Sequence, residues 1–272
     1  MLNVNLQQGN CLELMKDVPD KSIDMILCDL PYGTTKNKWD IVIPFDKLWE
    51  QYKRIIKDHG AICLFGTNPF SAKLICSNLN WYKHEWIWEK QKASNFMQAK
   101  YAPLKYHEDI LVFGEPGKLR IFNPQRYRVT EIQDIMGFSK KEMEYFFRNR
   151  QYDTFGKIDR RKTNNNPKTN KVFEGTSLKR TRTKDTGYRN PKSIIKINKS
   201  INKNSHPTQK PVALLEYLIK TYTNENDLVL DNCMGSGSTG VACANTNRNF
   251  IGMELDPKYF KIAKERINNA KC

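Results

Sequence analysis

The sequence predicts an α/β fold built around a largely parallel sheet. Its 272 residues, of which 39% are hydrophobic, suffice for one sizeable domain with a buried core. Residues 1–116 alternate short apolar runs with amphipathic stretches, and the same alternation returns from Pro207 to the end of the chain. Because strands that alternate with helices are typical of a parallel sheet, we expect both ends of the chain to contribute to one sheet.

In the first part of the chain, one amphipathic helix and five strands are expected. Apolar residues between positions 45 and 56 recur at helical spacing, with Pro44 near the start of the helix and Gly60 just beyond its end. The strands are short apolar runs. They lie at residues 4–6, 23–28, 61–65, 86–88 and 110–113.

The last part of the chain repeats this order of elements. Apolar side chains between residues 212 and 222 fall on one helical face, and residues 228–230 and 250–253 are expected strands. Asp256 can cap a final helix that begins at Pro257, because a side-chain oxygen before the first turn accepts the free backbone N–H groups. The buried face of this helix is expected to include Phe260, Ala263 and Ile267.

Most of the positive charge lies between these two parts, in residues 117–205. The formal net charge of the chain is +16, and this segment holds 23 Lys and Arg against 8 Asp and Glu, which gives +15. A charge of this size suggests a polyanionic partner. The segment also loses the apolar alternation and contains Asn-, Lys- and Thr-rich stretches. The chain is therefore divided into residues 1–116, a basic insert at 117–205, and residues 206–272.

The most ordered part of the insert is expected at residues 130–147. Thr130 can cap a short helix that ends at Gly137, and Ser139 can cap a second helix that follows it. The two helices would resemble a helix-turn-helix, although an ordinary helical hairpin fits the pattern at least as well.

The seven cysteines and the hydropathy of the chain indicate which class of protein it belongs to and where it is located. The cysteines form no Cys-x-x-Cys pair and lie mostly within apolar stretches, so we expect small hydrophobic residues rather than a disulfide framework or a zinc site. No apolar run approaches the roughly 18 residues of a membrane span, and the N-terminus lacks a basic and apolar leader. We therefore expect a soluble, cytoplasmic protein without a membrane partner.

The first chemical motif runs from Leu228 to Thr239 and joins a strand to a helix. Gly235 and Gly237 permit a sharp turn and close approach of a ligand, and the amides of the helix that follows would face the bound molecule. About 20 residues on, Glu254 ends the next strand, where a carboxylate can bind ribose hydroxyls. Separately these are an ordinary turn and a charge before a helix, but together they favour an adenosine-containing ligand.

The second motif, Asp29-Leu30-Pro31-Tyr32-Gly33, follows an apolar strand, and by itself it fits a simple turn as well as a catalytic site. Its chemistry suits an aromatic exocyclic amine, whose lone pair is delocalised into the ring and is a poor nucleophile. The carboxylate of Asp29 and the backbone carbonyl of Pro31 can accept the two N–H bonds and localise the lone pair, since the φ angle of proline is fixed. Tyr32 can stack on the base.

With these motifs the chain resembles the DNA amino-methyltransferases, which transfer a methyl group from S-adenosylmethionine to adenine N6 or cytosine N4. Their catalytic string, Asp/Asn/Ser-x-Pro-Tyr, is matched at residues 29–32, and aspartate at the first position is more like the adenine enzymes. Their cofactor loop ends in Gly-x-Gly, and residues 231–239, which contain Gly-Ser-Gly at 235–237, are similar, with Asn-Cys where Pro-Phe is common. The order of the motifs resembles the beta class, whose His-Pro-Thr-Gln-Lys-Pro string is matched in full at residues 206–211.

The resemblance implies a Rossmann-like, S-adenosylmethionine-dependent methyltransferase sheet with an inserted basic target-recognition region. Residues 1–116 would be its catalytic half and residues 206–272 its cofactor-binding half. Lys210 would lie near the methionine carboxylate. The expected catalytic residues are Asp29, Pro31 and Tyr32. The expected cofactor-binding residues are Asn10, Cys11, Asp29, His206, Thr208, Lys210, Asp231, Gly235, Ser236, Gly237, Ser238, Thr239, Glu254 and Leu255.

Two further stretches, at residues 88–90 and 105–108, resemble segments that frame the target-base pocket of this family. Each also has a purely structural explanation. His107 can be a satisfied histidine at a strand edge, and the tryptophans are expected to belong to the core rather than to stack on a base. These are Trp81, Trp86 and Trp88.

The resulting hypothesis is an enzyme that grips double-stranded DNA through its basic insert, flips an adenine into a pocket beside Tyr32 and methylates N6 by direct in-line transfer, without a metal. Cytosine N4 is the nearest alternative because it uses the same geometry. An RNA or protein methyltransferase and a non-catalytic DNA-binding protein on the same fold are the others. The sequence leaves open the recognition sequence, a homodimeric state, and whether the chain serves a restriction system with a partner restriction endonuclease, a phage or an orphan regulator.

Overall fold

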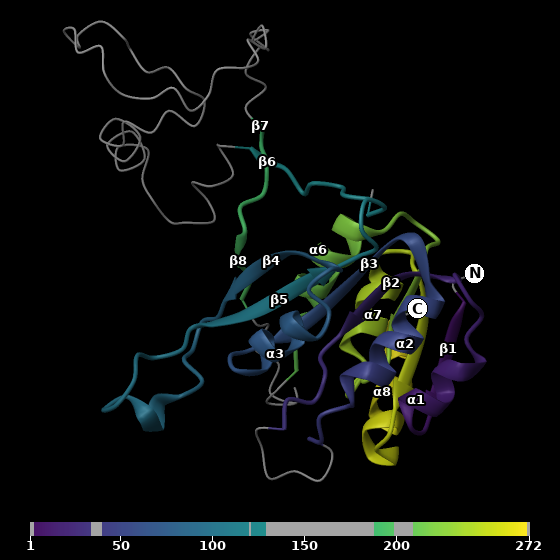
Figure 1. Cartoon of the computed structure of the whole chain (residues 1–272), viewed down its shortest axis with the longest axis horizontal. Helices are drawn as coiled ribbons and strands as arrows, with labels where there is room; N and C mark the ends of the chain where they lie inside the picture. The colour runs from purple at the N-terminus through teal and green to yellow at the C-terminus, as the bar shows by residue number, and fades with distance from the viewer. Residues whose placement is uncertain (1–2, 34–39, 120, 129–187, 199–208, 271–272) are drawn as a thin grey trace, which may run out of the picture. The chain divides into compact units, whose positions relative to one another are not determined.

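The structure is a computed structural model that describes residues 3–33, 40–119, 121–128, 188–198 and 209–270 (Figure 1). The chain divides into two compact units, one made of Met1–Gln125 with Lys192–Cys272 and the other of Arg126–Pro191. In the second unit, the short strands β6 (Tyr127–Arg128) and β7 (Tyr188–Arg189) pair antiparallel. The elements described below belong to the first unit.

An eight-stranded sheet forms the centre of the first unit. Across the sheet the strands are β1 (Val4–Gln8), β10 (Asn249–Glu254), β9 (Leu228–Asp231), β2 (Ile23–Cys28), β3 (Ile56–Gly66), β5 (His107–Phe113), β4 (Tyr82–Glu89) and β8 (Ile194–Lys196). Of these strands only β5 runs antiparallel to the others. The two ends of the chain meet where β9 pairs with β2, which confirms that both contribute to one sheet.

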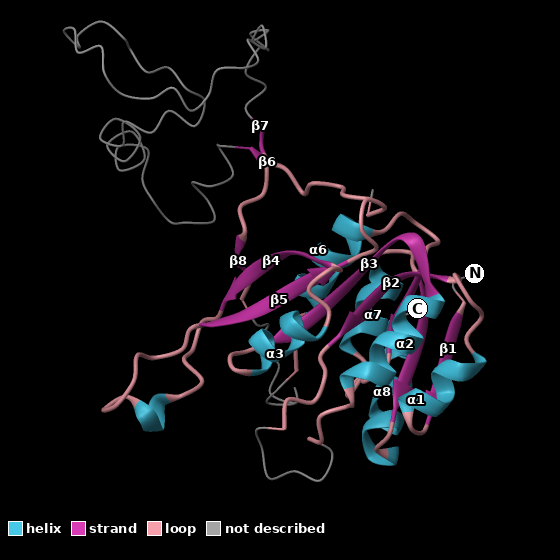
Figure 2. Ribbon diagram, in the orientation of Figure 1, coloured by secondary structure: helices cyan, strands magenta, loops and turns pink. Residues whose placement is uncertain are grey.

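Helices cover both faces of this sheet, as Figure 2 shows. The short helix α1 (Cys11–Leu14), with the 3-10 turn η1 (Met15–Asp17) after it, shares one face with α2 (Phe45–Ile55) and α3 (Phe70–Ser77). The other face carries α6 (Val212–Tyr222), α7 (Ser238–Asn245) and α8 (Pro257–Ala270). Alternate strand residues point into the two layers, so central strands such as β2 are buried on both faces.

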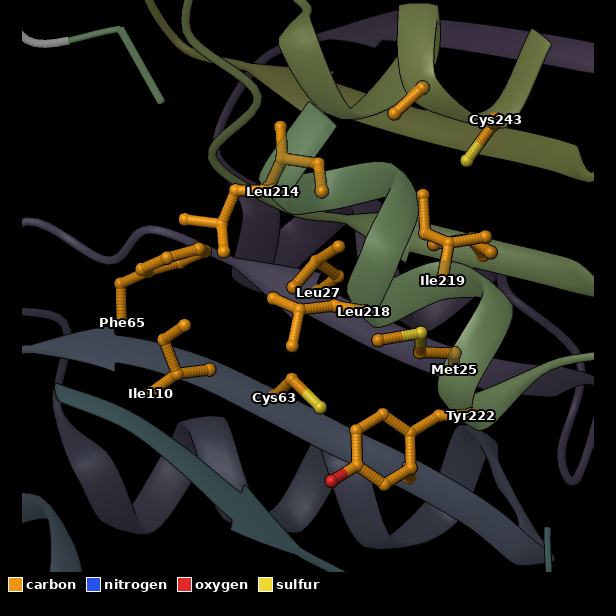
Figure 3. Close-up of a cluster of buried hydrophobic side chains, with 14 of the residues drawn as sticks. Met25, Leu27, Cys63, Phe65, Ile110, Leu214, Leu218, Ile219, Tyr222 and Cys243 are labelled. Atoms are coloured by element: carbon orange, nitrogen blue, oxygen red, sulfur yellow. The ribbon is translucent and has the colours of Figure 1, made fainter. Parts of the chain in front are cut away.

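The core beneath α6 shows how the two ends of the chain are held together (Figure 3). Leu218 and Tyr222 of α6 lie over Leu27 and Cys63 of the sheet, and all four side chains are almost completely buried. The Tyr222 hydroxyl accepts a hydrogen bond of 2.7 Å from Trp86 Nε1, so its burial leaves no unpaired polar group.

The helices and strands predicted for the described residues are present, although some of their bounds differ. Residues 23–28 form β2 with the predicted bounds, and Asp256 caps α8 by accepting the backbone N–H groups of the helix's second and third residues at 2.8 and 3.2 Å. Gly60, however, does not follow a helix end but lies inside β3. The reason is that Ile56 is already extended (φ −72°, ψ 137°) and pairs with Ile23, so strand follows helix without a loop.

The predictions for residues 117–205 are not decided by this fold. The expected helix pair at residues 130–147 lies outside the described residues, as does most of the basic insert, so the three-part division of the chain stays a prediction. Across the residues that are described, no helix is long and apolar enough to span a membrane.

Candidate active site

The two chemical motifs meet at one edge of the sheet. β2 connects through α2 to β3 on one side, whereas its neighbour β9 connects through α7 to β10 on the other side. The carboxyl ends of β2 and β9 therefore lie at a topological switch point, where open α/β sheets bind their ligands. Asp29 follows the end of β2 and Asp231 ends β9, so the sheet brings the two motifs together.

The loop after β9 makes the sharp turn that its glycines predicted. Gly235 and Gly237 have φ angles of +52° and +80°, in the left-handed region that favours glycine. A Cβ atom on Gly237 would lie 2.9 Å from Ala263 of α8, whereas one on Gly235 would have no atom within 4 Å. The loop therefore packs tightly at Gly237 and opens outward at Gly235.

The side chains of Asp231 and Arg266 both hold this loop in place. Asp231 is buried and accepts hydrogen bonds from the Cys233 backbone N–H (3.1 Å) and the Thr239 hydroxyl (2.6 Å). Arg266 of α8, which the sequence analysis did not single out, donates to the backbone oxygen and the hydroxyl of Ser236. Asp231 thus fixes the turn from within.

Glu254 ties the glycine loop to the end of β10. One of its carboxylate oxygens accepts the backbone N–H of Gly235 and the other accepts that of Asp256, both at 2.8 Å. Burial raises the pKa of this carboxyl. The next residue, Leu255, exposes 61% of its surface, so an acid and an apolar side chain stand together at this edge.

Asp29 is the centre of the second cluster. The Tyr32 hydroxyl donates to one of its carboxylate oxygens at 2.6 Å, and Lys210 Nζ contacts the other at 2.5 Å. The Tyr32 ring in turn lies against Phe70 of α3, with ring centroids 4.8 Å apart. The contact between Asp29 and Lys210 directly joins the Asp-x-Pro-Tyr string to the string that begins at His206.

Glu108 is a second carboxylate in this cluster that the list of expected site residues lacked. It lies between two ammonium groups, 3.2 Å from Lys210 Nζ and 3.1 Å from Lys90 Nζ. Burial opposes the charged forms, but the attraction within the cluster outweighs it: the pKa of Glu108 is lowered, and that of Lys210 is raised by Asp29 and Glu108. Lys210 is therefore a firmly charged group with two acidic partners.

Asn10 and Cys11 follow β1 at the same edge of the sheet, where the Gly9 backbone N–H donates to the Glu254 backbone oxygen at 3.0 Å. The Asn10 side chain caps α1, accepting the Leu12 backbone N–H at 2.9 Å. Cys11 is buried, and its contact with the Cys233 thiol together with burial raises its pKa, so it stays a neutral thiol. The two expected residues His206 and Thr208 lie outside the described residues.

The structural explanation holds for the tryptophans of the core, Trp86 and Trp88. Trp86 and Trp88 are buried in the core, as expected, and Trp88 Nε1 donates to the backbone oxygen of Ile197 at 3.0 Å. Trp81 is partly buried against the opposite helical layer. His107 is exposed as the first residue of β5.

Comparison with known proteins shows which family this chain belongs to. Residues 23–265 match the family described as DNA methylase, which spans both motifs and nearly the whole described sheet. The chain belongs to the DNA methylase family. The resemblance inferred from the motifs is therefore confirmed.

Two relatives and one solved structure are similar to this methylase along most of its length. The type II methyltransferase M.HpaI of Haemophilus parainfluenzae is 28% identical over 96% of this chain and 73% of that protein. The DNA adenine methyltransferase YhdJ of Escherichia coli K12 is also 28% identical, over 96% of this chain and 82% of that protein. The crystal structure of the M1.HpyAVI-SAM complex covers 97% of this chain and 99% of its own, with a TM-score of 0.60 and 23% identity, which confirms the fold.

The buried carboxyl of Asp231 is expected to make the methylase less stable as pH rises. Burial raises its pKa to about 7, although the hydrogen bonds from Thr239 and Cys233 oppose this. An unfolded aspartate has a pKa of about 3.9. Between these values the folded protein binds more proton than the unfolded chain, so this group lowers the free energy of unfolding as pH rises; outside the interval its contribution is constant.

Asp231→Asn removes this titration. The free energy of unfolding of the variant relative to the wild type should therefore increase between about pH 4 and about pH 7. Urea denaturation of both proteins at several pH values across this interval measures the difference. A difference that does not change with pH would show that Asp231 titrates normally in the folded protein.

Proposed function

We propose that this DNA methylase transfers a methyl group from S-adenosylmethionine to N6 of an adenine that is flipped out of double-stranded DNA. The proposal rests above all on the contact of Asp29 with Lys210, because it joins the string suited to an exocyclic amine to the string that accompanies the cofactor loop. The +15 charge of residues 117–205 supports extended nucleic acid as the substrate.

The residues at the switch point fit an adenosine-containing cofactor. Glu254 can accept ribose hydroxyls with its remaining lone pairs, and the exposed Leu255 can cover an adenine ring. The open space above Gly235 admits the ligand at the start of α7. Lys210 has three N–H donors, of which the contacts to Asp29 and Glu108 use two, so a third remains for a carboxylate. S-adenosylmethionine supplies a methyl group that its sulfonium makes electrophilic.

Asp29 and Tyr32 are arranged to prepare the amine. Lys210 keeps the Asp29 carboxylate paired with a positive charge, and the Tyr32 hydroxyl fixes its orientation. The carboxylate and the Pro31 carbonyl can then accept the two N–H bonds of the amine and direct its lone pair toward the methyl donor. Phe70 supports one face of the Tyr32 ring, which leaves the ring held in place for stacking. Positioning of this kind supplies much of the rate.

Adenine is favoured over cytosine by two observations. The catalytic string begins with aspartate, as in the adenine enzymes that it resembles, and YhdJ, a DNA adenine methyltransferase, is similar along nearly the whole chain. Membership of the family does not decide between the two bases, because it includes enzymes for both amines.

The expected product is therefore N6-methyladenine. Unmethylated DNA incubated with the protein and S-adenosylmethionine, then digested to nucleosides and analysed by mass spectrometry, should contain N6-methyl-2′-deoxyadenosine above the level in a reaction without protein. N4-methylcytosine as the sole methylated nucleoside would replace the adenine proposal with its nearest alternative. Absence of both nucleosides would overturn the proposed reaction.

A further inference from the structure

The loop between β4 and β5, residues 90–106, exposes an unusual share of large apolar side chains. Twelve such side chains are exposed in the described part of the chain, and five of them lie between Phe96 and Tyr106. The exposure is highest around the short 3-10 turn η2 (Phe96–Gln98), where Phe96 exposes 71% of its surface and Met97 86%, while the nearby Tyr101 exposes 90%. We call Phe96, Met97 and Tyr101 the loop tip. Because exposed apolar side chains so close together are unfavourable in water, the tip suggests a binding role.

The stem beneath this tip is well ordered. Asn95 joins the two sides of the stem: its side chain donates to the Pro103 backbone oxygen at 3.0 Å and accepts the Lys105 backbone N–H at 2.6 Å. The backbone N–H groups of Lys90 and Ser94 donate to the opposite arm at 2.6 and 3.1 Å. The tip is thus presented on a braced arm, and Figure 1 shows this arm extending away from the sheet beyond β4 and β5.

The arm leaves the sheet on the edge that carries the candidate active site. β4 runs parallel to β2 and β3, so its end at Glu89 and the start of β5 at His107 lie on the same edge as Asp29. The base of the arm also contacts the site. Lys90 pairs with Glu108, which pairs with Lys210, and Lys105 Nζ donates to the Thr67 hydroxyl after β3.

The charge of the arm fits a polyanion. Residues 90–106 contain four lysines and no aspartate or glutamate, and Lys92 and Lys100 are exposed beside the tip. Lysines that surround exposed aromatic and methionine side chains can contact phosphates while the apolar groups meet bases. A purely apolar protein partner would not need this charge.

We propose that the loop tip is a wedge that enters the DNA base stack beside the flipped adenine. Apolar side chains that insert between base pairs unstack them, and a side chain that fills the space left by a flipped base lowers the cost of its extrusion. Lys92 and Lys100 hold the adjacent phosphates. The inference rests on the function proposed above, since it assigns the tip to the step that delivers the base to Tyr32.

The test compares two substrates that differ only in the cost of flipping. One is a synthetic duplex containing the sequence that the wild-type protein methylates, and the other is the same duplex with the target adenine opposite an abasic site. A variant that combines Phe96→Ala, Met97→Ala and Tyr101→Ala should lose about tenfold or more in kcat/KM on the paired duplex and much less on the abasic one, because the unpaired base costs less to extrude.

Leu79→Ala is the matched control. Leu79 exposes 68% of its surface and lies just before β4, at the opposite edge of the sheet, so its variant should behave like the wild type on both duplexes. Unchanged binding of S-adenosylmethionine by the triple variant would show that the loss is not one of folding.

The outcomes separate this inference from the proposed function. If the wild type methylates the paired duplex and the triple variant does so equally well, the wedge is wrong and the proposed function stands. Equal losses on the two duplexes would also overturn the wedge and leave the tip as a simple DNA contact. A change of oligomeric state in sedimentation, with the ratio between the duplexes unchanged, would assign the tip to a contact between two copies. A wild type that methylates neither duplex would overturn both proposals.

Discussion

Replacing Asp29 by alanine is expected to lower kcat for methyl transfer by about 10²- to 10³-fold or more, the range that loss of one preorganised polar group in an active site typically produces. The variant loses the carboxylate that both Tyr32 and Lys210 contact, at 2.6 and 2.5 Å. Without it, the exocyclic amine keeps its lone pair delocalised. A radioactive methyl-transfer assay under saturating S-adenosylmethionine measures the effect.

Cofactor binding should survive this change. Lys210 still has Glu108 as an ionic partner at 3.2 Å, so the substitution does not leave a buried, unpaired ammonium. Calorimetric titration with S-adenosylmethionine should give a Kd within a few-fold of the wild type, whereas a lost cofactor site would give no binding. The methyl-transfer assay and the calorimetric titration therefore separate a loss of catalysis from a loss of cofactor binding.

Substitutions at Tyr32 and at Asp58 test whether the loss of activity is specific to the Asp29 carboxylate and its partner. Tyr32→Phe keeps the ring that packs on Phe70 but removes the hydroxyl donated to Asp29, so it should cost less activity than Tyr32→Ala, which removes both. Asp58→Ala removes a carboxylate that pairs with lysines on the surface, Lys21 and Lys118, and should leave kcat unchanged. Full turnover by Asp29→Ala would refute the catalytic assignment.

The parallel half of the sheet could be predicted because its signals are local. Runs such as residues 61–65 are apolar throughout, as is typical of strands buried on both faces, and the cap at Asp256 depends only on the residues that follow it. The glycine turn could also be predicted locally, since the left-handed backbone at residues 235 and 237 favours the glycines found there. These features need no knowledge of distant contacts.

The contacts of the site that the sequence did not reveal join residues far apart in the chain, including Glu108 of the stretch 105–108 that resembles the family's target-base pocket. Glu108 is joined to Lys210 across about a hundred positions, and only the antiparallel placement of β5 beside β3 brings them together. Phe70 lies in α3, a helix of eight residues that is too short to show a clear helical period, yet its ring supports Tyr32. The Arg266 contact with Ser236 likewise requires α8 to pack on the loop.

The structure also sharpens the role of Glu254. The sequence placed it at the end of a strand, where a carboxylate can bind ribose hydroxyls, but the carboxylate additionally accepts the backbone N–H of Gly235. The same acid that would contact the cofactor therefore sets the shape of the glycine loop. A substitution at Gly235, where an added side chain meets no protein atom, should therefore act mainly on cofactor binding.

Gly235→Val is expected to weaken binding of S-adenosylmethionine by about a hundredfold or more, which corresponds to about 2.7 kcal/mol. A Cβ atom at this position meets no protein atom within 4 Å, so the valine side chain would point into the open space proposed for the cofactor. The φ angle of +52° adds strain, because a left-handed conformation costs an L-residue roughly 1–2 kcal/mol. Isothermal titration of the variant measures the loss.

Gly117→Val separates the two effects. Gly117 has a φ angle of +74° and, like Gly235, no atom within 4 Å of an added Cβ, but it lies in the turn after β5, at the opposite edge of the sheet. Both variants should therefore lose similar thermal stability through backbone strain, and only Gly235→Val should lose cofactor binding. If both bound S-adenosylmethionine as tightly as the wild type, the glycine loop would not be the cofactor site. If both lost it equally, strain rather than occlusion would be the cause.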